Sequence, residues 1–203
     1  MTVTAAERGE RRDMSSMREI YIVATASADR VDTEALTEAL RADDVEISID
    51  QNGVFCSIKA EQSRVEIRFE SRSEPLGWAP ELLEGPGDVR EFLQNARGFY
   101  RISFEPGQPQ NSVAVFEALW AARTLLELVD GVCVDTSAFK LHDQQDIEEI
   151  TELDFDIRDH ITVHGVDMPG QASQLWVHTH GMSKFGVPDV EMFFIHEDDV
   201  PAR

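Results

Sequence analysis

The sequence predicts an α+β protein, a two-layer fold with helices packed on one face of a largely antiparallel sheet or sheets. Three observations predict this class. Several short segments alternate apolar and polar residues, which is typical of half-buried strands. One long segment, residues 113–129, is apolar over most of its surface, as expected for a helix central to a core. Glycine and proline separate the segments, and 203 residues suffice to bury such a core.

Residues 18–107 are predicted to form a first α+β half. The preceding residues 1–17 are polar and aperiodic, which predicts a disordered tail. The predicted elements are a strand (18–26), a helix (32–41), three strands (45–49, 54–60 and 64–70), a helix (88–97) and a strand (98–104). Asn52 and Gly53 suit a tight hairpin between the second and third strands. This order of elements predicts a ferredoxin-like half.

Residues 108–203 are predicted to form a second α+β half, after a proline- and glycine-containing boundary at residues 105–111. Its predicted elements are the apolar helix (113–129), a strand (132–136), an acidic surface helix (141–153) and three strands (157–166, 175–181 and 190–195). The pattern leaves open whether this half is a separate domain or shares one core and one sheet with the first half.

The composition restricts the class of partner. Against 39 acidic residues the chain has only 18 Lys and Arg, which gives a formal net charge of -21. Such a surface repels phosphate backbones and anionic lipid, so neither nucleic acid nor a membrane is an expected partner. This charge either only keeps the protein in solution or attracts a basic protein partner. The oligomeric state is not predicted.

The cysteines and the apolar segments indicate the cellular setting. Cys56 and Cys133 lie in predicted strands without a C-x-x-C spacing, which predicts buried, reduced thiols. The chain has no apolar leader near its N-terminus and no apolar run of the roughly 20 residues that span a bilayer. These features predict a cytoplasmic protein.

Two late strands are predicted to carry a histidine face. Their odd-numbered residues, such as Val163 and Val177, are apolar, so antiparallel neighbours would bury that side. The even-numbered side then gathers His160, Thr162, His164, Trp176, His178 and His180. With strands about 5 Å apart and i to i+2 spacings of about 7 Å, three imidazoles are expected to reach one ion.

The histidine face leaves three readings open. His178-Thr179-His180 is an H-x-H pair, and a nearby carboxylate would complete a site for zinc, iron or manganese. The candidate metal ligands are His160, His164, His178, His180, Asp189 and Glu191. In this reading the protein is a metal-dependent hydrolase with a metal-bound water as nucleophile. In a second reading the bound metal is adventitious or structural. In the third the histidines are ordinary surface residues, and no cofactor is expected.

The segment from Trp176 to Glu191 resembles bacterial families of unknown function. These families carry a W-x-H-T-[HY]-G-L-x-[KR]-[FC]-G-x-P-[DE]-[LV]-E run after a G-V-x-x-D segment, which here is Gly131–Asp135. Met182 stands where the pattern has leucine. The resemblance implies an intracellular bacterial protein without an established activity, and it transfers no catalytic residue.

The leading hypothesis from the sequence is a cytoplasmic, non-enzymatic module that binds a protein partner. An immunity- or antidote-like role against a basic partner is one form of it. The candidate binding residues are Trp176, His178, His180, Phe185 and Glu191. The metal-dependent hydrolase is the alternative, and no catalytic side chain is assigned. A further alternative is a small-ligand sensor, with the loop around Trp78 closing over the sheet.

Overall fold

The computed structural model describes residues 18–41, 46–48, 56–59, 64–72, 83, 87–104, 111–168 and 174–196. In chain order the elements are β1 (Arg18–Thr25), α1 (Thr33–Ala39), β2 (Glu46–Ser48), β3 (Cys56–Lys59), β4 (Arg64–Ser71), α2 (Gly87–Asn95), β5 (Gly98–Phe104), α3 (Asn111–Leu128), β6 (Gly131–Asp135), β7 (Lys140–His142), α4 (Gln144–Glu152), η3 (Ile157–His160), β8 (Thr162–Asp167), β9 (Gln174–His180), η4 (Met182–Phe185) and β10 (Glu191–His196). The expected tail (1–17), hairpin turn (52–53), loop around Trp78 and boundary segment (105–110) lie outside the described residues.

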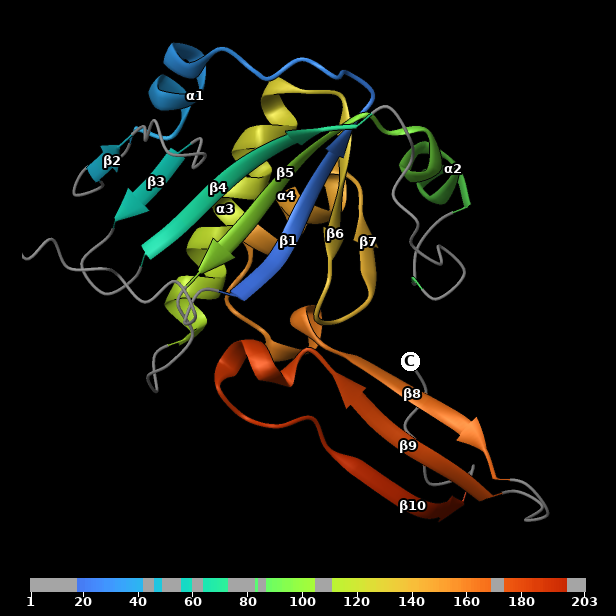
Figure 1. Ribbon diagram of the computed structural model, residues 1–203. Coiled ribbons are helices and arrows are strands. Elements are labelled where there is room, and N and C mark those ends of the chain that lie inside the picture. The colour runs from blue at the N-terminus through green and yellow to red at the C-terminus, as the bar shows by residue number, and fades with distance from the viewer. Residues whose placement is uncertain are drawn as a thin grey trace, which may run out of the picture.

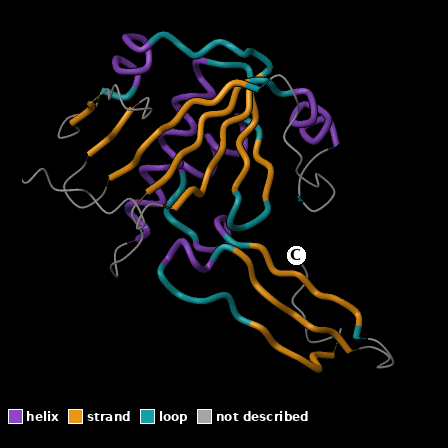
Figure 2. The backbone as a smooth tube through the Cα atoms, viewed as in Figure 1, coloured by secondary structure: helices purple, strands orange, loops and turns teal. Residues whose placement is uncertain are grey.

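A seven-stranded sheet forms the main body, in the order β2-β3-β4-β5-β1-β6-β7 with antiparallel neighbours (Figures 1 and 2). β1 lies between β5 and β6 and is buried on both faces from Ile20 to Ala24. Since β6 and β7 come from residues 108–203, one sheet continues across the boundary expected near residue 107. The predicted α+β class is confirmed.

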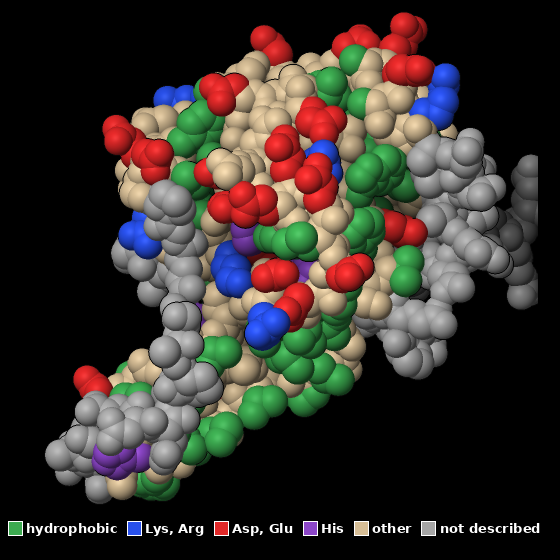
Figure 3. Space-filling view, turned by 180° about the vertical axis from the view of Figure 1, so that it is seen from behind, with side chains coloured by type: hydrophobic (Ala, Val, Ile, Leu, Met, Phe, Trp, Pro, Cys, Tyr) green, Lys and Arg blue, Asp and Glu red, His purple; other side chains and the backbone are tan. Residues whose placement is uncertain are grey.

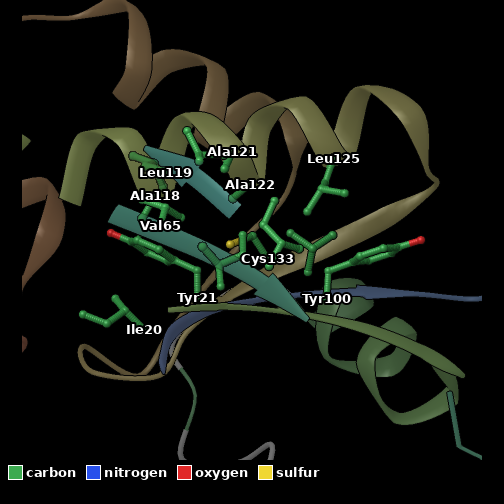
Figure 4. Packing of buried hydrophobic residues seen from close by; sticks show 14 of the residues in the cluster. Ile20, Tyr21, Val65, Tyr100, Ala118, Leu119, Ala121, Ala122, Leu125 and Cys133 are labelled. Carbon is green, nitrogen blue, oxygen red and sulfur yellow. The ribbon is translucent and has the colours of Figure 1, made fainter. Parts of the chain in front are cut away.

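Helix α3 covers one face of this sheet. Its buried residues Ala118, Leu119, Ala122 and Leu125 face side chains from β1, β4, β5 and β6 (Figure 4). The prediction of a helix over residues 113–129 is confirmed to within two residues at either end. The small alanine side chains permit a close approach of helix to sheet, and the leucines fill the space between them.

Helix α2 packs on the opposite face, which differs from the expected single helical face. Its Val89 and Leu93 form a second cluster with Ile22, Val132 and Val134. The uninterrupted apolar run of β1 is the reason, because a strand with apolar residues on both sides needs cover on both sides. The main body therefore has three layers where α2 and α3 face each other across the sheet.

The connectivity also differs from a ferredoxin-like half. That arrangement uses split β-α-β units, in which another strand lies between the two strands joined by a helix. Here α2 joins β4 to β5, and these two strands are adjacent and antiparallel. The sheet is thus extended by antiparallel neighbours, with a helix inserted in one connection.

Two predicted boundaries differ because of side-chain caps. Asp143 caps α4 through a reciprocal pair of hydrogen bonds with Asp146, so the helix starts after residue 143 and residues 141–142 remain in β7. Asp156 accepts a hydrogen bond from the backbone N–H of Arg158, which starts the 3-10 helix η3 where a strand was expected.

A separate three-stranded antiparallel sheet follows, in the order β10-β9-β8, and it projects from one end of the main body (Figure 1). We call it the small sheet.

Both cysteines are buried free thiols, in β3 and β6. None of the helices in the described ranges is long and apolar enough to cross a membrane.

Candidate functional site

The small sheet meets the main sheet at the turn between β6 and β7. Thr162, at the start of β8, donates a hydrogen bond from Oγ1 to the carbonyl oxygen of Ala138 over 2.7 Å. Phe139 lies edge-on to His180 at the end of β9, with ring centroids 4.9 Å apart. The backbone of Phe139 has a φ of 56°, a left-handed conformation that side chains larger than glycine rarely adopt. This turn therefore fixes where β8 and β9 leave the body.

A buried ion pair joins the same two parts. Lys184 in η4 is 0% exposed, and its Nζ donates a hydrogen bond to Oδ2 of Asp135, which is 1% exposed at the end of β6. Oδ1 of Asp135 accepts from the backbone N–H groups of Ser137 and Ala138 and from the Ser137 hydroxyl. Burial alone raises the pKa of Asp135, but the Lys184 charge and these hydrogen bonds hold it below its usual value. The carboxylate is therefore charged.

His160 lies beside this ion pair and not with the other histidines of the predicted face. It ends η3, where its ring stacks on Phe155 with centroids 4.9 Å apart and lies edge-on to Phe185 at 6.0 Å. Burial lowers the pKa of His160 to about 4, and the positive charge of Lys184 acts in the same direction. This candidate metal ligand is a neutral core residue.

We expect His160 to make the protein acid-sensitive. Because the folded pKa is about 4 and the unfolded value is 6.5, the unfolded chain binds the extra proton as the pH falls through this window. Stability is thus complete above pH 6.5 and decreases toward pH 4, by up to about 3 kcal/mol for this group. Urea unfolding of His160→Leu at several pH values should show a shallower decrease than the wild type.

The control for this prediction is His196→Gln, on the exposed end of β10, which should keep the wild-type slope. Equal slopes for wild type and His160→Leu would contradict the assignment of His160 as a neutral buried group.

The remaining histidines of the predicted face do come together. The register pairs His164 of β8 with His178 of β9, and His180 follows two residues later on the same side. The ring centroids are 5.4 Å apart for His164 and His178, 5.1 Å for His164 and His180, and 4.8 Å for His178 and His180. We call these three residues the imidazole cluster.

Aromatic side chains extend the cluster along the sheet. The ring of Trp176 lies 4.4 Å from that of His178 and is inclined to it by 28°. Phe193 of β10 is almost parallel to Trp176, with centroids 6.0 Å apart. Nδ1 of His178 and Nε1 of Trp176 are buried and have no hydrogen-bond partner among the described residues. Polar atoms in this position usually have a partner, so their lack of one calls for an explanation.

The other candidate site residues have different places. Glu191 of β10 pairs with His178 in register, so it shares the face of the cluster. Oδ1 of Asp189 accepts hydrogen bonds from the Met182 N–H at 3.0 Å and the Thr179 hydroxyl at 3.3 Å, which shapes the connection before β10. Phe185 packs against the core of the main body. Glu191 is thus the candidate carboxylate that accompanies the cluster.

Two further facts describe the imidazole cluster, one electrostatic and one geometric. Burial lowers the pKa of His180. Positive charge on His178 or His164 lowers this pKa further, whereas the negative charge of Asp189 raises it. In the part of the chain that the structure describes, no group of three or more His, Cys, Asp and Glu side chains is arranged to hold a metal ion. Burial therefore favours the neutral form of His180.

The apolar flank of the small sheet is less covered than the sequence predicts. Val163 and Met192 lie on the side opposite the cluster, and both are exposed. Figure 3 shows hydrophobic side chains running from the main body out along the small sheet. Val163 lies on the side of the sheet that the alternation predicts. Val163 and Met192 are not buried because the sheet projects from the body.

The edge strand β10 exposes three successive large apolar residues. Met192 is 50% exposed, Phe193 53% and Phe194 62%. The register with β9 shifts between Met192 and Ile195, which is a bulge, and Phe194 has a φ of 63°. Exposed apolar groups of this size on a strained edge strand are a feature of interaction surfaces.

Sequence reasoning missed the Asp135–Lys184 pair and Phe139. Lys184 is one of three lysines in the chain and the one that lies between the glycines Gly181 and Gly186. Phe139 gave no signal, because its position depends on a left-handed turn.

Comparisons with protein-family models, curated proteins and solved structures return no match for this chain.

Proposed function

We propose that the protein is a non-enzymatic binding module that takes a protein partner on the small sheet. The observation that carries this proposal is the half-exposed run of Met192, Phe193 and Phe194 on β10. Large apolar side chains in water are stabilised when a partner covers them.

Charge favours a particular kind of partner. Among the described residues most acidic side chains belong to the main body, since β8, β9 and β10 carry only Asp167 and Glu191 as acidic residues. A partner that fits has an apolar contact surface bordered by basic residues that face the body. A second copy of this chain fits less well because its acidic body would be repelled. An antidote-like role is one form of this function.

Replacing Phe194 separates binding from stability. Asn tolerates the left-handed backbone that Phe194 occupies. We therefore expect Phe194→Asn to leave the free energy of unfolding unchanged or slightly increased while it weakens partner binding by at least about tenfold. Affinity purification from the native cells, with quantitative mass spectrometry, measures the retained protein.

Leu153→Asn provides a matched control, because Leu153 is 65% exposed but lies on the main body. We expect a retained protein that still binds to Leu153→Asn but no longer binds to Phe194→Asn. Added salt should release this protein. An unchanged set of retained proteins in Phe194→Asn would contradict the proposal. A dimer in light scattering that Phe194→Asn dissociates would replace the proposed partner with a second copy.

A further inference from the structure

We propose that His164, His178 and His180 form a binding site for one divalent transition-metal ion, with zinc as the reference ion. The site is on the small sheet but goes beyond the proposed function, because ion binding requires no protein partner. It assigns no hydrolytic activity.

The strand register brings the three side chains together. Two of them come from an H-x-H pair on β9, and the third lies directly across on β8. Residues i and i+2 of a strand share a face, and so do directly opposed residues of antiparallel neighbours. Hydrogen-bonded strands hold the Cα and Cβ atoms in place, so the backbone needs no rearrangement.

The spacing of the rings matches that of three ligands on one ion. Zinc binds imidazole nitrogen at about 2.0–2.1 Å, and tetrahedral geometry then puts neighbouring ring centroids roughly 5 Å apart. The observed separations are 4.8, 5.1 and 5.4 Å.

The ring nitrogens do not converge in the structure, which is why no metal-holding group is found among the described side chains. The missing step is rotation about the Cβ–Cγ bond. The centroid of an imidazole lies close to this axis, so rotation redirects the nitrogens and leaves the centroid spacing nearly unchanged. This torsion is broad in histidine, and its rotation is inexpensive.

Two further features of the cluster suit a cation. Nδ1 of His178 is buried and has no hydrogen-bond partner among the described residues. A bound ion would provide a partner for this ring. Glu191, in register with His178, adds a negative charge on the same face. Imidazole ligands favour zinc, copper, nickel and iron over magnesium or calcium.

Cobalt(II) and zinc titrations of the untagged full chain test the site. We expect one equivalent of cobalt to give the visible absorption of a tetrahedral ion, and one equivalent of zinc to displace it. Zinc should also raise Tm, because it binds the folded chain. His164→Gln, His178→Gln and His180→Gln should each weaken binding by about 100-fold.

Two controls decide the outcome. His196→Gln, on the same sheet but outside the cluster, should bind cobalt like the wild type. Circular dichroism should show that the three cluster variants remain folded. The proposal is overturned if wild type takes up no cobalt, if the bound ion is octahedral, or if the cluster variants and His196→Gln bind equally well.

Discussion

Lys184→Met should destabilise the protein by about 3–5 kcal/mol, the usual cost of removing one partner of a buried ion pair. The change leaves the Asp135 carboxylate buried with three hydrogen bonds from Ser137 and Ala138 but without its counter-charge. Asp135→Asn should be costly for the converse reason, because it leaves an ammonium group in the core. Urea unfolding followed by circular dichroism measures both losses.

The double variant Lys184→Met/Asp135→Asn carries the stronger prediction. It removes both charges, so its loss should be smaller than the sum of the two single losses by roughly 1–3 kcal/mol. Arg41→Met is the control, because Arg41 pairs with Glu38 on the surface, with side chains 69% and 72% exposed. That change should cost less than about 1 kcal/mol. Additive losses in the double variant would show that the two buried charges do not interact.

Gly181→Ala should be the second large effect, at about 2–3 kcal/mol. Gly181 has a φ of +102°, which an alanine adopts only with strain, and a Cβ would lie 2.7 Å from the carbonyl oxygen of His160. Backbone contacts this close force β9 away from the end of η3. Since Gly181 directly follows His180, the change should also displace the imidazole cluster from Phe139.

Gly87→Ala is the matched control, because a Cβ at Gly87 meets no atom within 4 Å. Its unfolding midpoint in urea should equal that of the wild type or lie slightly above it. If Gly181→Ala proves as harmless as Gly87→Ala, the close packing of β9 on η3 is not a requirement of the fold.

Local pattern predicted much of the candidate site. Alternation of apolar and polar residues gave β9, and parity alone placed His164, His178 and His180 on one side. This succeeded because the two-residue period of a strand does not depend on what packs above it. The same reasoning failed for His160, where the side chain of Asp156 caps a helical turn and moves the residue off the strand.

Long-range features were not predictable from the pattern. Lys184 and Asp135 are 49 residues apart in the chain, and only the position of η4 against the end of β6 makes them a pair. The cover on an apolar strand is also set by tertiary structure. The apolar residues of β1 are covered by α3 on one face of the sheet and by α2 on the other. Val163 and Met192, in contrast, extend beyond the main body and remain exposed.

Site-specific photo-crosslinking tests the central claim, that the small sheet is the surface that meets a partner. A photoreactive amino acid replaces Phe194 on β10 in one variant and Leu153 on the main body in another, and both are expressed in the native cells. We predict that irradiation joins one basic protein to the Phe194 position and none to the Leu153 position. Crosslinks from Leu153 alone, or from neither position, would contradict the account.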